Sequence, residues 1–228
     1  MDALAFEEYS DEIYQNLKSK EHLYLPNPHY IEETQSKMKI PHRLMIIGWI
    51  KEVHNTLSLD NDTLFLSVYL FDRYMSIQPN VNRDKFQLIA ITCMFIASKY
   101  EEVVKVPISN FESICINTES DIKAMEVIIL QTLNYDITQA YSNTFVGIFA
   151  NKMNLGASLT KKAFAYADIA LSDYDLIQYK PSLIAAASIY LALNAFLPAE
   201  FIRVVPYSIR EIQPVLNKLE EFVKTQRV

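Results

Sequence analysis

Glycine is scarce in this chain of 228 residues, which contains only Gly48, Gly147 and Gly156. Hairpin turns and phosphate-binding loops depend on glycine, because its backbone reaches conformations that other residues avoid. A sheet-rich fold and a glycine-rich nucleotide site are therefore disfavoured. Half of the residues are hydrophobic, and this composition favours a packed, all-helical protein.

Positive charge is also in short supply. The chain carries 21 Lys and Arg against 27 Asp and Glu, a formal net charge of −6, and it has no run of five basic residues. Nucleic-acid binders concentrate Lys and Arg on one face, so we expect no nucleic-acid partner. The longest apolar stretches, 88–97 and 183–193, are shorter than the roughly 20 residues of a membrane-spanning helix, so we expect no membrane partner.

Residues that support catalysis or metal binding are few and scattered. Cys93 and Cys115 both adjoin apolar residues and are expected to be buried and reduced. The four histidines show no spacing typical of metal ligands, and no nucleophile or phosphate-binding motif occurs. The acidic N-terminal segment lacks the basic character of a signal peptide. We therefore expect a non-enzymatic protein without metal or cofactor, located in the nucleus and cytoplasm.

Prolines divide the sequence into stretches, most of which carry helical periodicity. Proline disfavours the interior of a helix, so these breaks outline the helices. No strand is predicted. The predicted helices span 4–18, 41–57, 61–77, 83–99, 107–115, 119–133, 141–154, 158–177, 181–195 and 208–225.

Two of these helices have related sequences. The stretch 88–97 is apolar on all sides, and a helix without a polar face must be surrounded by other helices. The stretch 183–192 aligns with it 95 residues later, with four identical positions. The pattern indicates two structurally similar helical domains, with a junction near 136–142.

The segment 92–102, Thr-Cys-Met-Phe-Ile-Ala-Ser-Lys-Tyr-Glu-Glu, resembles the cyclin box, whose pattern ends in Ser-Lys-aromatic-Glu-Glu. Segments 9–17 and 176–182 resemble the N-terminal helix and the second repeat of mitotic A- and B-type cyclins. Further matching positions occur in order at Arg43, Trp49, Asp72, Arg73, Met125, Glu126 and 133–136. By these motifs the chain is identified as a member of the cyclin family, and it is most similar to the A/B type.

The resemblance implies an all-α fold of two tandem cyclin-box repeats with a short N-terminal helix. The helix and a linker would span 1–30, the first, kinase-binding box 31–138, and the second repeat 139–228. It further implies a regulatory subunit that binds and activates a cyclin-dependent serine/threonine protein kinase and helps to recruit substrates in cell-cycle control. Such a subunit carries no catalytic residue.

Nine residues match the kinase-binding surface of cyclins. Lys99 and Glu126 would form charge-assisted hydrogen bonds beside the regulatory helix of the kinase. Considered alone, two such charges usually face solvent, and Ile96 and Leu130 are equally typical of core packing. The apolar seat for the kinase helix would comprise Ile96, Tyr100, Leu130, Tyr135 and Ile137, with Tyr9 and Ile13 added from the first helix.

Six more residues match the hydrophobic patch by which cyclins recruit substrates and inhibitors that carry a basic-x-Leu motif. Glu52 would hold the basic residue, and an apolar stripe would receive the leucine. The alternative is that the stripe belongs to the core face of an amphipathic helix. His42 and Gly48 stand where these cyclins usually have Met and Asp. The six residues are Met45, Ile46, Trp49, Glu52, Arg83 and Gln87.

Arg43 and Asp72 match an internal ion pair of the family and are expected to be structural. Two other functions stay open at this point. A cyclin-fold transcription factor would bind promoter DNA, which the acidic charge disfavours. A cyclin-fold scaffold without a kinase partner would be favoured if Lys99 or Glu126 were buried in an internal ion pair.

Overall fold

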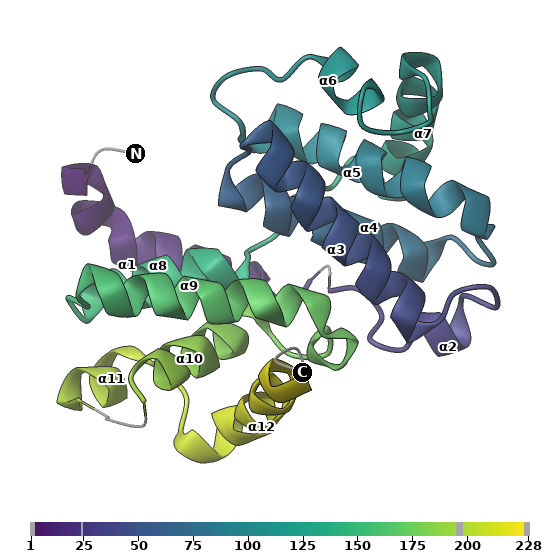
Figure 1. Ribbon diagram of the computed structural model, residues 1–228. Coiled ribbons are helices and arrows are strands. Elements are labelled where there is room, and N and C mark those ends of the chain that lie inside the picture. The colour runs from purple at the N-terminus through teal and green to yellow at the C-terminus, as the bar shows by residue number, and fades with distance from the viewer. Residues whose placement is uncertain (1–2, 24, 195–197, 226–228) are drawn as a thin grey trace. The chain divides into compact units, whose positions relative to one another are not determined.

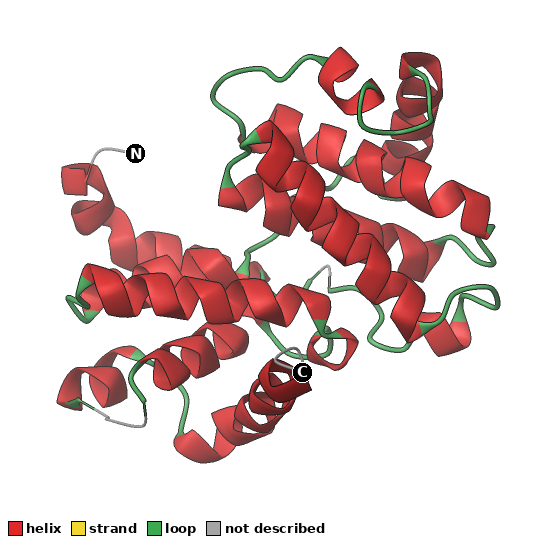
Figure 2. Cartoon of the chain, viewed as in Figure 1, coloured by secondary structure: helices red, strands yellow, loops and turns green. Residues whose placement is uncertain are grey.

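The computed structural model describes residues 3–23, 25–194 and 198–225, and only the backbone of residues 3–10. Within these ranges the chain forms helices and loops without a strand, which confirms the all-α prediction (Figures 1 and 2). The helices are α1 (Ala3–Lys20), α2 (Tyr30–Glu33), α3 (Ile40–Leu57), α4 (Asn61–Ile77), α5 (Phe86–Glu101), α6 (Ile108–Glu112), α7 (Glu119–Thr132), α8 (Ser142–Lys152), α9 (Ala157–Ser172), α10 (Pro181–Ala192), α11 (Ala199–Val204) and α12 (Ile209–Thr225), with 3-10 helices η1 (Arg83–Lys85) and η2 (Tyr174–Leu176).

The chain divides into two compact units. One unit comprises Pro26–Thr138, and we call it the first repeat. The other combines Met1–Leu25 with Gln139–Val228, and we call it the second repeat. Helix α1 therefore groups with the repeat that is farther from it in the sequence.

Helix α5 is the centre of the first repeat. It packs against α3, α4, α6 and α7, and every residue of 88–98 is buried. This arrangement confirms the interpretation of 88–97 as a helix that needs neighbours on all sides. In the second repeat α10 has the same role, because it packs against α8, α9 and α12.

A buried ion pair joins α3 to α4 in the first repeat. Arg43 donates from Nε to Asp72 Oδ1 at 2.8 Å and from Nη2 to Oδ2 at 2.7 Å, and its side chain is only 1% exposed. The hydroxyl of Tyr30 donates to the same carboxylate at 2.9 Å, which ties α2 to the pair. Burial opposes the charge of Arg43, but the carboxylate of Asp72 outweighs it and raises the pKa of the guanidinium.

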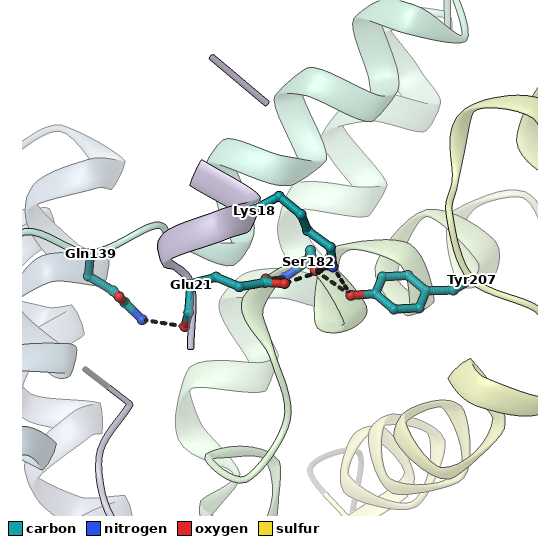
Figure 3. A network of polar contacts seen from close by, with 5 residues as sticks. All are labelled: Lys18, Glu21, Gln139, Ser182 and Tyr207. Atoms are coloured by element: carbon teal, nitrogen blue, oxygen red, sulfur yellow. Dashed lines mark hydrogen bonds and ion pairs between the residues drawn. The ribbon is translucent and has the colours of Figure 1, made fainter. Parts of the chain in front are cut away.

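The C-terminal end of α1 is fastened to the second repeat by a polar network (Figure 3). Glu21 is completely buried and accepts hydrogen bonds from the Ser182 backbone N–H, at 3.1 Å, and from Lys18 Nζ, at 2.7 Å. Lys18 also bonds Ser182 Oγ, at 2.8 Å, and the Tyr207 hydroxyl. Burial opposes the charge on Lys18, but the bonds to Glu21 and Tyr207 outweigh it, so its pKa is raised.

Aromatic packing holds the preceding turn of α1. The ring of Tyr14 lies against Phe145 and Phe149 of α8, with centroid distances of 6.1 and 5.9 Å. Such pairs stabilise a contact beyond the area they bury. Helix α1 is therefore an integral part of the second repeat.

Several predicted boundaries are wrong. The helix predicted at 83–99 begins as the 3-10 helix η1 and becomes α-helical only at Phe86. The helix predicted at 158–177 ends at Ser172, because Asp173 is extended and its side chain caps η2. Helices α2 and α11 were not predicted, since elements of four and six residues are too short to show periodicity. Cys93 is buried as predicted, whereas Cys115 is only half-buried.

The Arg43–Asp72 pair yields a stability prediction. Asp72→Asn is expected to lower the free energy of unfolding by about 3–5 kcal/mol, because Arg43 keeps a buried charge without a counter-charge. The double variant Arg43→Met/Asp72→Asn is expected to lose less, since no charge remains buried and the new amide oxygen still accepts from the Tyr30 hydroxyl. Urea denaturation followed by circular dichroism measures both. Equal destabilisation of the two variants would contradict the electrostatic explanation.

The anchor of α1 yields a second prediction. Glu21→Ala is expected to lower the free energy of local unfolding of α1 by about 1–3 kcal/mol, because the buried Ser182 N–H loses its acceptor. The control is Asp11→Ala, which removes a surface ion pair between Asp11 and Lys152 and is expected to lower it by less than about 1 kcal/mol. Hydrogen exchange of the amides of 11–20 measures both effects. If the two variants behaved alike, Glu21 would not be the anchor.

Candidate functional site

The first candidate surface is built on α5 and α7, which pack against each other. Lys99, in the last turn of α5, forms an ion pair with Glu126 in the middle of α7. The ammonium group also lies 4.4 Å from the centroid of the Phe95 ring, a cation–π contact that orients the lysine stem. Two sequence-predicted residues that are 27 positions apart are thus brought together.

This ion pair lies at the surface. The side chain of Lys99 is 37% exposed and that of Glu126 is 15% exposed. An ion pair in such a position contributes about 1 kcal/mol or less to stability, so hydrogen bonds to a partner can replace it at small cost. The scaffold alternative required burial of these charges, and the arrangement does not favour it.

The predicted apolar seat is divided between surface and core. Tyr100 and Tyr135 are exposed by 53% and 66%, and Leu130 and Ile137 are half-buried. Ile96 is only 3% exposed and packs inside the first repeat. In the free chain its role is that of a core residue, and its contact with a kinase stays a prediction.

The exposed residue Tyr135 has an unusual backbone conformation. Its φ is 58° and that of Asn134 is 52°, so two consecutive non-glycine residues are left-handed. The N–H of Tyr135 donates to the Leu130 carbonyl at 2.8 Å and closes the end of α7. Because this conformation is unfavourable for a bulky residue, the strain points to a role for the exposed ring.

Sequence reasoning missed further exposed apolar side chains on α7 and on the segment after α5. Val103 and Val104 come after Glu102, the C-cap residue of α5, and are 101% and 78% exposed. Val127 and Ile128, which follow Glu126 in α7, are 51% and 45% exposed. The sequence contained a signal for this exposure. Val103 and Val104 occur in a loop, and Val127 and Ile128 lie outside the apolar stripe of α7.

The second glutamate of the box motif has a structural role. Glu102 accepts hydrogen bonds from the backbone N–H of Asp60, at 2.7 Å, and from Thr63 Oγ1, at 2.6 Å. These donors lie at the N-terminal end of α4, where a carboxylate satisfies free N–H groups and the helix dipole. Glu102 therefore fixes the end of α5 to α4.

The two remaining kinase-binding predictions fall on α1. Ile13 is half-buried in the second repeat. The side chain of Tyr9 lies outside the described residues, although its backbone belongs to α1. Both contacts stay predictions.

The second candidate surface is a stripe on α3. Met45 is 71% exposed, Ile46 and Trp49 are half-buried, and Glu52 is exposed. We call these four residues the docking stripe. The core face of the helix is formed instead by the buried residues Ile47, Ile50 and Val53. The docking stripe is therefore not the core face of the amphipathic helix, which was the alternative.

The other two docking residues adjoin the N-terminal end of α3 and the start of α5. Arg83 is exposed and donates from Nε to the Lys37 carbonyl at 2.8 Å, in the segment that precedes α3. Gln87 is half-buried in the first turn of α5, which packs against α3. The role of Arg83 and Gln87 in docking stays a prediction.

Metal binding and membrane insertion are two other classes of function to which the described residues can be compared. Among the described side chains, no three His, Cys, Asp or Glu residues gather closely enough to hold a metal ion. No helix in the described ranges is both long and apolar enough to span a membrane.

Comparison with known families agrees with the fold and the motifs. Residues 12–138 match the family model described as Cyclin, N-terminal domain, and residues 140–228 match Cyclin, C-terminal domain. Cyclin-B2-2 of Oryza sativa subsp. indica is 35% identical over 199 residues, 85% of this chain and 47% of the relative. G2/mitotic-specific cyclin-B of Arbacia punctulata is 31% identical over 225 residues, 95% of this chain and 55% of the relative. This chain thus spans about half the length of the curated relatives it matches.

A solved structure has the same fold. The X-ray structure of a viral cyclin from herpesvirus saimiri matches with a TM-score of 0.80 and 20% identity, over 92% of this chain and 96% of that chain. The two domain matches and the fold confirm the family that the box motif predicted, with mitotic B- and A-type relatives. The chain belongs to the cyclin family.

Proposed function

We propose that this chain is a non-catalytic regulatory subunit that binds and activates a cyclin-dependent serine/threonine protein kinase in cell-cycle control. The observation that carries the proposal is the surface ion pair of Lys99 and Glu126, on two helices that also carry or precede the exposed tyrosines Tyr100 and Tyr135. The relatives of this chain also support the proposal, since two of them are named G2/mitotic-specific cyclins. A matching solved structure of 14% identity and TM-score 0.65 is the yeast RNA Pol II CTD kinase CTDK-1 complex.

The chemistry of this surface suits the end of a partner helix. A helix end presents backbone carbonyls or N–H groups without partners, which an ammonium or a carboxylate can satisfy. Lys99 would donate to carbonyls and Glu126 would accept from N–H groups, while the exposed apolar side chains exclude water around them. The interface energy would hold the kinase regulatory helix in its active position and so favour the active state.

We further propose that the docking stripe recruits substrates or inhibitors with a basic-x-Leu motif. An exposed methionine and a half-buried tryptophan beside an exposed glutamate provide an apolar seat next to a negative charge. A leucine would enter the seat at Met45, Ile46 and Trp49, and a basic residue would pair with Glu52.

The kinase-binding proposal is tested by removing and by reversing the ion pair. Lys99→Ala/Glu126→Ala is expected to keep the fold, because a surface pair adds little stability, and to lose binding by about 2–5 kcal/mol per contact. Lys99→Glu/Glu126→Lys keeps an ion pair but reverses its polarity, so it is also expected to bind no kinase. Co-purification with kinase and a phosphorylation assay measure both.

The matched control is Glu119→Ala/Lys123→Ala, which removes another surface ion pair of α7, with 3.1 Å between Lys123 Nζ and Glu119 Oε2. This control is expected to bind kinase as the wild type does. A charge-reversed variant that still activates kinase at the wild-type level would overturn the assignment of this surface. Loss of the fold in the reversed variant would show that the pair is structural.

The docking proposal is tested with a labelled Arg-x-Leu peptide in fluorescence anisotropy. Trp49→Ala is expected to weaken peptide binding by more than about tenfold, as truncation of an aromatic anchor removes about 2 kcal/mol. Glu52→Lys is expected to weaken it by charge repulsion, and less so as the salt concentration rises above about 0.1 M. Kinase binding is expected to stay unchanged in both. Peptide binding that ignores both substitutions would refute the docking site.

A further inference from the structure

The imidazole of His42 has a defined orientation at the start of α3. His42 is the third residue of the helix, and its Nδ1 accepts a hydrogen bond from the Lys39 backbone N–H at 3.0 Å. A neutral ring that accepts at Nδ1 carries its proton on Nε2, so Nε2–H is a donor. The side chain is half-buried, and within the described residues no hydrogen bond engages Nε2.

The helical spacing places this donor at one end of the docking stripe. His42 precedes Met45 and Ile46 by three and four residues, so it lies on the same face, one turn away. Glu52 lies at the opposite end. With a rise of about 1.5 Å per helical residue, each end is about 8 Å from the middle of the apolar seat, which is about two residues of an extended peptide.

The charge at the two ends of the docking stripe differs in sign. Lys37, Lys39 and Arg83 are exposed at the N-terminal end of α3, and Arg83 is held there by its bond to the Lys37 carbonyl. Asp84 is the exposed acidic neighbour of Arg83. The helix dipole adds positive potential at the same end. A peptide that pairs its basic residue with Glu52 therefore carries its following residues toward positive potential.

We propose that His42 is a specificity-determining residue, whose Nε2–H donates to a carboxylate about two positions after the leucine of a basic-x-Leu peptide. The inference rests on the proposed docking function. The peptide runs antiparallel to α3, with its basic residue at Glu52, its leucine in the apolar seat and its carboxylate at His42. The backbone N–H of Lys39 holds the imidazole ring of His42, and this contact does not need the Lys39 side chain.

The experiment compares peptides that differ at one position. Labelled Arg-x-Leu-x-Asp, Arg-x-Leu-x-Ala and Arg-x-Ala-x-Asp peptides are titrated against the wild-type chain by fluorescence anisotropy at fixed salt and pH. The Asp peptide is expected to bind at least about tenfold more tightly than the Ala peptide, as a charge-assisted hydrogen bond provides. The peptide without leucine is expected not to bind.

Three variants separate the hydrogen bond from the general positive charge. His42→Gln is expected to keep the preference for Asp, because glutamine at this helix position accepts from the Lys39 N–H and presents an N–H of its own. His42→Met offers neither group and is expected to lose the preference while leucine-dependent binding persists. Lys39→Ala keeps the backbone donor and is expected to change the preference by less than about twofold.

The outcomes distinguish this inference from the docking proposal. Leucine-dependent binding by the wild type without a preference for Asp would overturn the role of His42 and leave the docking site intact. Absence of leucine-dependent binding would overturn both. A preference that survives in His42→Met but falls in Lys39→Ala would assign the specificity to the lysine charge and overturn the role of His42. A wild type without the preference for Asp overturns the inference even where a variant fails to fold.

Discussion

The first repeat depends on one constraint, which is that α5 has no polar face over 88–98 and must be covered on every side. Helices α3, α4, α6 and α7 provide that cover. Burial ends abruptly after Ser98, where Lys99 and Tyr100 emerge at the surface. The position of the candidate kinase-binding residues is therefore a consequence of the packing around α5. The same constraint acts on α10 in the second repeat, where Asn194 stands at the position that corresponds to Lys99.

Hydrophobic burial alone does not set the registers of these helices, because apolar contacts have little directional preference. Directional polar contacts set the registers instead. Arg43 and Asp72 pair α3 with α4, and Glu102 joins the end of α5 to the start of α4. In the second repeat Glu21 joins α1 to the start of α10. The contacts of Arg43 with Asp72 and of Glu21 with Ser182 are buried, so leaving one partner alone is costly, and this makes the register specific.

Polar groups at the two candidate surfaces are arranged differently. Lys99 and Glu126 satisfy each other in the free chain and remain accessible, so their exchange for partner contacts requires little energy. His42 has one ring nitrogen engaged and the other unengaged by the described residues. The first arrangement suits a partner that brings its own helix end. The second suits a partner that brings a single acceptor.

The sequence by itself determined the helical class, the two hub helices and the family, because periodicity and local motifs are properties of neighbouring residues. It also predicted Lys99 and Glu126 as interface residues, by resemblance, although nothing in their spacing shows that they meet. Only the tertiary structure decided that Ile96 lies in the core while Tyr135 is exposed, and that α1 joins the second repeat. The contact between Glu21 and Ser182 spans 161 positions of the chain. The physical reason is that burial and pairing depend on segments distant in sequence, and a local pattern carries no information about which distant segment will cover it.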